Sequence, residues 1–492
     1  MEDGMGTPLP DQVGDLPCLA GGGPMLAESG DWIDVACPSD GQVFARVPAC
    51  GSGEVDRAVG AARAAFDGDW GRMPAVERGR ALSRLSRLVA EAEDELAAME
   101  SRDTGKPLRQ GLADARAAAR YYEFYGGAAD KLHGSTIPFL PGHTALTLRE
   151  PHGVVAGIIP WNYPLQIMAR VVGAALATGN ALVVKPAEDA SLSALRIAAM
   201  AAEAGLPAGA LNVVTGTGEE AGAPLAAHRG VDYVTFTGSP ATGSAIQRAA
   251  AERNAGTTME LGGKSPQIVF ADADLDRAMP FLVNAIMQNG GQTCSAGSRV
   301  LVERGVYDEV ARRLSERFAT LEAGPHDGAH DLGPMISARQ KERVVGFVER
   351  AEAAGADVLA RGRIAMDASA AGHFVEPVLF GDVDPASELA REEVFGPVLA
   401  LFPFDSEARA IELANATAYG LVASVWTRDG GRQHRVAKAV RAGQVFVNNY
   451  GAGGGVELPF GGFGRSGHGR EKGFDALFDM TTIKTVVWDH SR

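Results

Sequence analysis

The sequence is poor in cysteine, and its few cysteines suit neither disulfides nor a metal site. Among 492 residues there are only four, Cys18, Cys37, Cys50 and Cys294. Their spacing matches neither a zinc site nor the dense framework of a disulfide-stapled domain. We therefore expect no bound metal, and a structural or incidental role for the first three cysteines.

Long apolar runs and an excess of positive charge are also missing. No apolar run reaches the roughly 18 residues that a membrane-spanning helix needs. The acidic start, MEDGMGTPLPDQVGDLP, lacks a basic and apolar secretion signal, which predicts a cytoplasmic protein. The formal net charge of -15 argues against binding to nucleic acid or to an anionic membrane.

The remaining composition predicts a globular protein of two or three domains. Hydrophobic residues make up 46% and charged residues 22%, and the length is too great for one simple core. Residues 1–30 are rich in Gly, Pro and Asp, which predicts a flexible extension. Helical periodicity covers 54–66, 75–102 and 108–130, whereas 131–150 and 481–487 have the pattern of strands.

Strands and helices alternate from position 153 to position 239. Short apolar runs at 154–159, 181–184, 211–214 and 233–236 suit a buried parallel sheet, with crossover helices between them. This is a dinucleotide-binding architecture in outline, although its first turn lacks GxGxxG. A glycine turn at 238–243 instead follows the fourth strand and opens a helix whose amides can face a phosphate.

The stretch 257–300 contains the residues best suited to chemistry. Glu260 precedes two glycines, and 34 positions later Cys294 lies in a loop of small polar residues after a helix at 275–287. Small neighbours leave the sulfur reachable, which favours a nucleophile. The alternative is that Cys294 is a small buried hydrophobe, as cysteines commonly are.

MELGGKSP followed by GQTCSAGSR resembles the paired signatures of the aldehyde dehydrogenase superfamily, and the resemblance extends from about position 51 almost to the C-terminus. It implies an α/β fold with a Rossmann-like NAD-binding domain (31–130 and 151–259) and an α/β catalytic domain (260–477). It also implies a small β oligomerisation segment (131–150 and 478–492) and a homodimer or homotetramer.

The resemblance assigns roles that fit the chemistry of aldehyde oxidation. An aldehyde carbon is sp2 and must gain a nucleophile before it can release hydride, which is the role implied for Cys294. Asn162 and the Cys294 amide would stabilise the oxyanion, and Glu260 would activate the water that cleaves the thioester. Relatives that transfer the acyl group to coenzyme A lack this glutamate. A catalytically inactive homologue is the other alternative, disfavoured because these residues are present.

The family pattern also marks residues for the cofactor. Lys185, which is also a candidate catalytic residue, and Glu188 would meet the adenosine ribose, where a carboxylate repels a 2′-phosphate and favours NAD over NADP. The candidate cofactor contacts as a set are Ile159, Pro160, Trp161, Lys185, Glu188, Gly216, Gly238, Ser239, Gly243, Leu261, Glu393 and Phe395.

The sequence indicates the substrate less clearly than it indicates the fold or the reaction. Tyr163, Arg170 and Gln288 are the candidate contacts. Succinate semialdehyde dehydrogenases carry an arginine at the position of Arg170, which indicates a carboxylate-bearing aldehyde because a buried guanidinium needs an anion. Their second arginine is replaced here by Gln288. Arg170 could instead form a salt bridge at a subunit contact. The candidate substrates are therefore a simple aldehyde, a semialdehyde, and a betaine or amino aldehyde.

Overall fold

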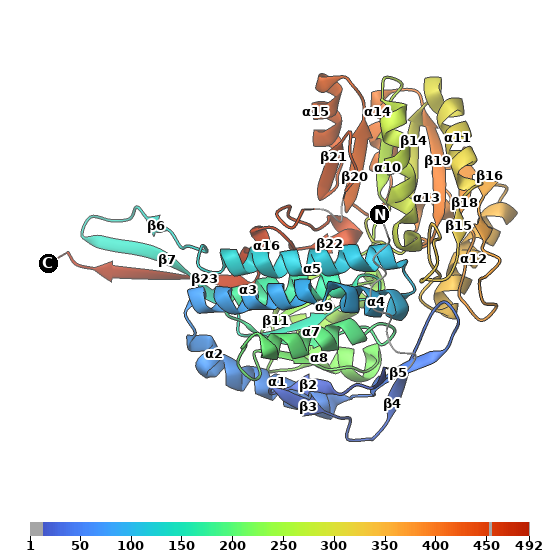
Figure 1. Cartoon of the computed structure of the whole chain (residues 1–492). Coiled ribbons are helices and arrows are strands. Elements are labelled where there is room, and N and C mark those ends of the chain that lie inside the picture. Colours follow the sequence, from blue (N-terminus) through green and yellow to red (C-terminus); the bar gives the residue numbers. More distant parts are fainter. Residues whose placement is uncertain (1–12, 452–454, 492) are drawn as a thin grey trace.

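The computed structural model describes residues 13–451 and 455–491. It consists of two α/β lobes and a three-stranded arm that projects from the first lobe (Figure 1). A largely parallel sheet lies at the centre of each lobe, which confirms the predicted α/β class. None of the helices in these residues combines the length and apolar character needed to cross a bilayer.

The first lobe is built on an eight-stranded sheet. Five apolar strands form its parallel centre, and antiparallel partners close both edges. The central strands are buried on both faces, as a parallel sheet covered by helices requires. In spatial order the strands are β22 (Gly467–His468), β12 (Gly256–Glu260), β11 (Tyr233–Thr237), β8 (Val154–Ile158), β9 (Ala181–Lys185), β10 (Leu211–Val213), β2 (Cys18–Ala20) and β3 (Gly23–Met25).

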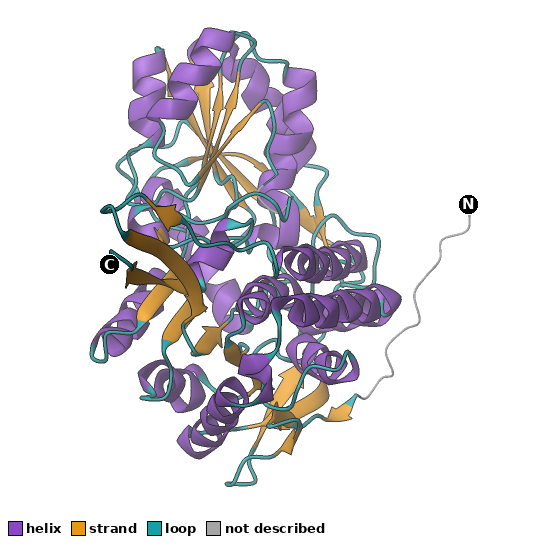
Figure 2. Ribbon diagram, turned by 90° about the vertical axis from the view of Figure 1, so that its left-hand side faces the viewer, coloured by secondary structure: helices purple, strands orange, loops and turns teal. Residues whose placement is uncertain are grey.

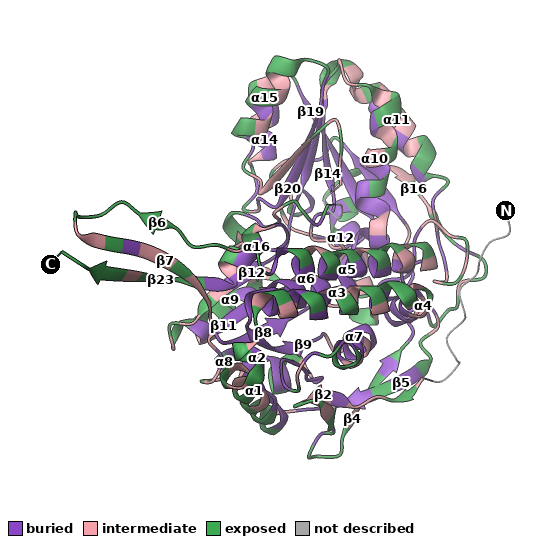
Figure 3. Ribbon diagram, turned by 60° about the vertical axis from the view of Figure 1, so that its left-hand side comes forward, coloured by how far each residue is buried: buried purple, intermediate pink, exposed green. Residues whose placement is uncertain are grey.

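Helices cover this sheet, and α6 is the most deeply placed of them. Every residue of α6 except Arg170 is buried, because α3 and α5 pack over it (Figure 3). The predicted helix 75–102 is two helices that meet at Ala92. The helices of this lobe are α1 (Ser52–Asp67), α2 (Asp69–Arg72), α3 (Ala75–Glu91), α4 (Glu93–Thr104), α5 (Leu108–Ala128), α6 (Pro164–Thr178), α7 (Leu192–Glu203), α8 (Ala223–Ala227), α9 (Pro240–Ala251) and α16 (Asp475–Asp479).

The predicted flexible extension, residues 1–30, is wrong for residues 13–30, and residues 1–12 lie outside the described residues. β2 pairs with β10, and the first residue of β2, Cys18, is fully buried. β1 (Gly14–Asp15) pairs with β5 (Val43–Pro48), which in turn pairs with β4 (Trp32–Ala36). Composition misled here, because glycine and proline serve tight turns between short strands equally well.

The second lobe has a seven-stranded sheet with helices on both faces (Figure 2). Its strands in spatial order are β16 (Asp357–Arg361), β18 (Val378–Gly381), β19 (Val398–Phe404), β14 (Arg299–Glu303), β13 (Pro266–Val269), β20 (Val422–Trp426) and β21 (Gln444–Val447). Its helices include α10 (Leu275–Met287), α11 (Arg304–Phe318), α12 (Ala338–Ala353), α13 (Glu388–Arg391), α14 (Glu407–Ala414) and α15 (Gly430–Ala439), and a small pair, β15 (Glu322–Ala323) and β17 (Arg363–Ile364), lies beside them.

The predicted catalytic domain, 260–477, extends too far toward the C-terminus. β22 pairs with β12 in the first lobe, and Ala476 and Leu477 of α16 belong to the first lobe's core. The chain therefore returns to the first lobe before it enters the arm. There β23 (Thr481–Asp489) pairs along its length with β7 (His143–Pro151), which also pairs with β6 (Thr136–Ile137).

Candidate active site

A cleft of about 670 Å³ lies where the two lobes meet, at the carboxyl ends of β8, β11 and β12. Open α/β sheets bind ligands at this edge, because the loops that follow the strands converge there. The second lobe supplies the opposite wall. The cleft is lined by Pro160, Trp161, Asn162, Thr237, Gly238, Ser239, Pro240, Ala241, Glu260, Leu261, Gly262, Cys294, Arg339, Gln340, Arg343, Glu392, Glu393, Phe395, Tyr419 and Arg465.

Cys294 reaches the cleft from a tightly held loop. After α10 the chain reverses through Asn289 and Gly290, both at positive φ (51° and 60°). Gln292 then fixes the loop, since its side chain bonds the carbonyls of Asn289 and Pro334 and the amide of Ile336. Burial raises the pKa of the Cys294 thiol to about 12, and the Arg170 guanidinium opposes that shift. The thiol is therefore protonated at neutral pH and must lose its proton to react.

Asn162 follows β8 and is 4% exposed. Its side-chain Nδ2 donates to the carbonyl of Gln292, 2.9 Å away, so the amide group lies beside the loop that carries Cys294. An amide nitrogen has two hydrogens, and one of them is left for a ligand in the cleft. Asn162 and Cys294 line the same cleft, so Asn162 is a candidate donor to a ligand bound there.

Glu260 ends β12 as a buried carboxyl group without hydrogen-bond partners. It is 2% exposed, and neither of its oxygens has a partner among the described residues. Burial and then the charge of Glu471 raise the pKa of Glu260 well above its usual value, against the pull of Arg170. Gly461 makes this placement feasible, because a Cβ there would lie 2.8 Å from Glu260 Oε1. A buried group without partners is costly, so it indicates a site that serves a ligand or a water molecule.

One side of the cleft suits a dinucleotide. Ser239 caps α9, accepting from the amide of Thr242, and the start of that helix opens onto the cleft. A Cβ at Gly238 would lie 2.5 Å from the Phe236 ring, so the turn that leads into this helix packs closely against the ring and favours glycine. Phe395, at φ 61°, meets the Trp161 ring edge-on at 5.4 Å.

Glu393 completes this side of the cleft as a fixed carboxyl group. Its Oε1 accepts a 2.9 Å hydrogen bond from the amide of Gly263. Burial raises the pKa of Glu393 to about 7, against that hydrogen bond. The carboxyl group can therefore accept from a ligand hydroxyl near neutral pH.

Five of the candidate cofactor residues, Ile159, Lys185, Glu188, Gly216 and Gly243, do not line the cleft. Lys185 ends β9 as a buried residue, and its Nζ lies 3.0 Å from Glu188 Oε2. Ile159 donates its amide to the Lys185 carbonyl, which places this pair beside the β8 turn. Gly216 and Gly243 have packing reasons to be glycine, since a Cβ would lie 2.5 Å from the Cys50 carbonyl and from the Leu261 side chain, respectively.

The three candidate substrate residues are held by the protein itself or lie apart from the lining. Tyr163 is buried, and its hydroxyl lies 2.9 Å from Thr293 Oγ1. Arg170 Nη1 forms an ion pair with Glu471 Oε2 at 3.5 Å, and its guanidinium lies 5.4 Å from the centre of the Phe460 ring. Gln288 ends α10, and its carbonyl accepts from Thr293. The salt bridge of Arg170 is thus formed within the chain.

Sequence reasoning missed the basic residues of the cleft. Arg339 and Arg343 lie one turn apart at the start of α12, and Arg465 comes from the segment before β22. Nothing in the local pattern around them distinguishes them from surface arginines. Their place becomes evident only when the lobes come together.

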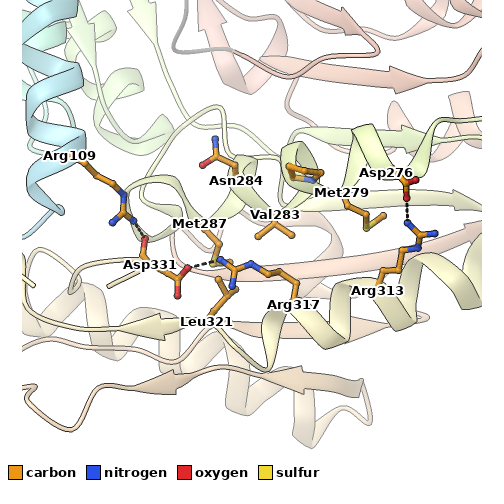
Figure 4. A pocket seen from close by; sticks show the side chains of 11 residues that line it. Arg109, Asp276, Met279, Val283, Asn284, Met287, Arg313, Arg317, Leu321 and Asp331 are labelled. Atoms are coloured by element: carbon orange, nitrogen blue, oxygen red, sulfur yellow. Dashed lines mark hydrogen bonds and ion pairs between the residues drawn. The ribbon is translucent and has the colours of Figure 1, made fainter. Parts of the chain in front are cut away.

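A second cavity, the α10–α11 groove, has a similar size but different chemistry (Figure 4). It measures about 550 Å³. Arg313 pairs with Asp276 at 2.5 Å, Arg317 pairs with Asp331 at 2.6 Å, and Arg109 donates to the carbonyls of His330 and Asp331. Its lining residues are Arg109, Asp276, Met279, Pro280, Val283, Asn284, Met287, Arg313, Arg317, Leu321 and Asp331.

The cleft combines a thiol, an amide donor and a buried carboxyl group at the carboxyl edge of a dinucleotide-type sheet, an arrangement typical of an α/β oxidoreductase. Residues 25–486 match the model of the aldehyde dehydrogenase family. The chain belongs to this family, as its two signature motifs indicated.

Three relatives illustrate the match. The chain is 42% identical over 459 residues to (Z)-2-((N-methylformamido)methylene)-5-hydroxybutyrolactone dehydrogenase from Acinetobacter baylyi, covering 92% of this chain and 93% of the relative. A putative aldehyde dehydrogenase from Burkholderia cenocepacia has a TM-score of 0.96 at 59% identity, covering 96% and 100%. An aldehyde dehydrogenase from Bacillus cereus, solved as its NAD+ complex, has a TM-score of 0.94 at 40% identity, covering 96% of each chain.

Proposed function

We propose that this protein oxidises an aldehyde to the carboxylic acid with NAD as hydride acceptor, through a covalent Cys294 adduct. The observation that carries the proposal is that Cys294, Asn162 and the unpartnered Glu260 line one cleft. The thiol gives its proton to water and its sulfur bonds to the aldehyde carbon, while the C=O π pair moves to the oxygen. The second hydrogen of Asn162 Nδ2 and the Cys294 amide then stabilise this oxyanion. NAD, when bound, accepts the hydride.

Glu260 then serves hydrolysis. Its carboxylate takes a proton from water, the hydroxide adds to the thioester carbon, and the sulfur leaves as the acid is released. A buried carboxyl group without protein partners can accept such a water. The basic test is aldehyde-dependent NADH production by the purified protein without coenzyme A. Cys294→Ala should lower that rate by about 10³-fold or more, and undiminished activity in this variant would refute the mechanism.

NAD is favoured over NADP by Glu188. Burial opposes ionisation of this carboxyl group, but the Lys185 ammonium, together with hydrogen bonds from the backbone amides of Glu188 and Gly218, holds the pKa of Glu188 below its usual value. A charged carboxylate beside the ribose accepts from two hydroxyls and repels a 2′-phosphate. Glu188→Gln should therefore lower the ratio of kcat/KM with NAD to kcat/KM with NADP. Glu219→Gln, which changes an exposed glutamate, should leave this ratio unchanged.

For the substrate we propose a neutral aldehyde, because Arg170 already has a carboxylate partner in Glu471. A carboxylate-bearing aldehyde such as succinate semialdehyde is the second candidate. It is favoured by one observation: Arg170 Nε is buried and has no hydrogen-bond partner among the described residues. A cationic betaine or amino aldehyde is disfavoured by the buried guanidinium.

The substrate test is a panel of aliphatic, aromatic, carboxylate-bearing and cationic aldehydes, assayed with wild type and Arg170→Met. A neutral substrate predicts a preference for uncharged aldehydes and no selective loss for the semialdehyde in the variant. A preference for the semialdehyde that Arg170→Met abolishes through a raised KM would establish the second candidate instead.

We also propose that the arm mediates homodimer or homotetramer formation. Large apolar side chains are exposed along it, among them Phe139, Leu148, Ile483, Val487 and Trp488. Exposed large apolar side chains in this number on one projecting element are typical of an interface. Light scattering on the full-length protein should give a dimer or tetramer, and Ile483→Lys with Trp488→Lys should shift it toward the monomer.

A further inference from the structure

Three charged residues are completely buried behind the cleft and have no part in the mechanism above. Lys106 is 1% exposed, Glu100 0% and Asp114 2%. Lys106 follows α4, which carries Glu100, and it precedes α5, which carries Asp114. These helices and α6 lie side by side (Figure 3). The Lys106 ammonium lies 3.0 Å from Glu100 Oε1 and 2.5 Å from Asp114 Oδ2.

The third partner of this ammonium is the main chain of the oxyanion donor. Lys106 Nζ donates to the carbonyl oxygen of Asn162 at 3.0 Å. The same oxygen accepts from Asn289 Nδ2 at 2.9 Å. The ammonium also lies 4.5 Å from the centre of the Tyr163 ring, the next residue along. An ammonium has three hydrogens, and here they have three acceptors, so its position is fully determined.

The Asn162 carbonyl sets the direction of the Asn162 side chain. The carbonyl carbon and the side chain of Asn162 are both bonded to its Cα. The two hydrogen bonds to the carbonyl oxygen hold the peptide plane in place, and they thereby restrict the direction in which the side chain projects. Nδ2 then needs only its bond to the Gln292 carbonyl to orient its free hydrogen. Because a hydrogen bond to a developing oxyanion depends on geometry, a displaced amide stabilises the transition state less.

Stability alone does not account for three buried charges. Apolar residues of similar volume commonly stabilise a core as well as a buried ion cluster does, since burial removes each charge from water. Asp114 is oriented further by Gln166 on α6, whose Nε2 donates to Asp114 Oδ1 at 2.6 Å. The cluster therefore connects α4, α5 and α6 to a single atom of the active-site turn.

We propose that Lys106, held by Glu100 and Asp114, is the positioning residue that orients Asn162 for oxyanion stabilisation. This inference rests on the proposed function. It assigns the cluster a role in the steps that form a tetrahedral oxyanion, and none in binding the cofactor.

The test uses the full-length enzyme with the triple substitution Glu100→Gln, Lys106→Met and Asp114→Asn, which removes all three charges at similar volume and leaves none unpaired. Its kcat and NADH burst rate should fall by about 10- to 100-fold, with KM for the aldehyde and Kd for NAD nearly unchanged, because the lost interaction is made only in the transition state. Arg78→Met is the matched control. Arg78 donates to the Ala177 carbonyl at the far end of α6, and its loss should lower Tm without changing kcat.

A double-mutant cycle separates positioning from a general structural effect. Asn162→Ala alone should cost about 10²–10³ in rate. Adding the triple substitution to Asn162→Ala should cost no more than about twofold, because the cluster acts through Asn162. Additive losses, or a triple variant as fast as wild type, would overturn the inference.

Two further outcomes also bear on the inference: a triple variant that does not fold, and a wild-type enzyme without activity. If the triple variant does not fold, Asp114→Asn alone, which keeps the cation and one counter-ion, should lower kcat by a smaller factor and have no effect in the Asn162→Ala background. A rate loss that persists in that background would again overturn the inference. If wild-type enzyme does not reduce NAD with any aldehyde, the proposed function fails, and the inference that rests on it is overturned with it.

Discussion

The cleft and the α10–α11 groove are cavities of similar size, but they differ in whether their charged side chains have hydrogen-bond partners. In the groove every arginine is bonded to a carboxylate or a carbonyl, and the partners are partly exposed. In the cleft Glu260 is buried, and neither of its oxygens has a partner within residues 13–451 and 455–491. An unsatisfied buried polar group costs roughly 1–3 kcal/mol. Cavity size therefore does not distinguish the two, whereas unmet hydrogen-bonding capacity identifies the cleft as the place where a ligand completes the structure.

The largest effect is expected when the carboxylate of Glu260 is removed, and this variant tests the difference between the two cavities most directly. Glu260→Gln keeps the shape of the side chain but removes the base, so steady-state turnover should fall by about 10²–10⁴. The first turnover should survive, because adduct formation and hydride transfer precede hydrolysis. Stopped-flow measurement should therefore show a full NADH burst followed by almost no turnover, and added hydroxylamine should restore turnover by cleaving the thioester. A lost burst would assign Glu260 to an earlier step.

The second prediction changes the charges around Glu260 and follows the pH dependence. Burial and Glu471 raise the pKa of Glu260, and Arg170 lowers it. Activity needs the carboxylate, so the rate should rise with pH through this pKa. Glu471→Gln removes a negative charge and should move that rise to lower pH by about one unit, whereas Arg170→Met should move it upward by a similar amount.

Glu471→Gln and Arg170→Met serve as controls for each other, because their expected pH shifts have opposite signs. Both substitutions remove one buried charge, and Arg470 and Asp479, which also act on Glu260, stay in place. A profile of steady-state kcat against pH, taken with a neutral aldehyde, gives both shifts. Shifts of the same sign in the two variants would contradict an electrostatic origin.

The smallest effect is expected in the groove. The Arg317 and Asp331 side chains are 47% and 29% exposed, and such surface pairs contribute about 0–1 kcal/mol. Arg317→Met should therefore change the free energy of unfolding in urea by less than about 1 kcal/mol and leave kcat and KM unchanged. An equally small effect for Glu260→Gln on turnover, or a large one for Arg317→Met, would remove the distinction between the two cavities.

Many of the helices and strands could be predicted from the sequence, because capping residues and short apolar runs mark where they begin and end. The helix 275–287 has the predicted bounds, since Asp274 caps its start and the glycine-rich turn ends it. The four strands 154–159, 181–184, 211–214 and 233–236 agree with the structure to within about a residue or two, because fully buried strands read as short apolar runs. The N-terminal strands and the return of 467–480 to the first lobe were not predictable, since both depend on pairing with distant strands.

The sequence by itself determined the chemical groups of the candidate site: two motifs name a thiol and a carboxyl group, and a third names an amide donor. Only the tertiary structure decided how these groups are tuned and held. Arg170 has a partner in Glu471, 301 positions away in the chain, the cleft gains Arg339 and Arg465 from separate segments, and Lys106 bonds Asn162 across 56 positions. The physical reason is that burial and electrostatic fields depend on distance in space, whereas a sequence records only distance along the chain.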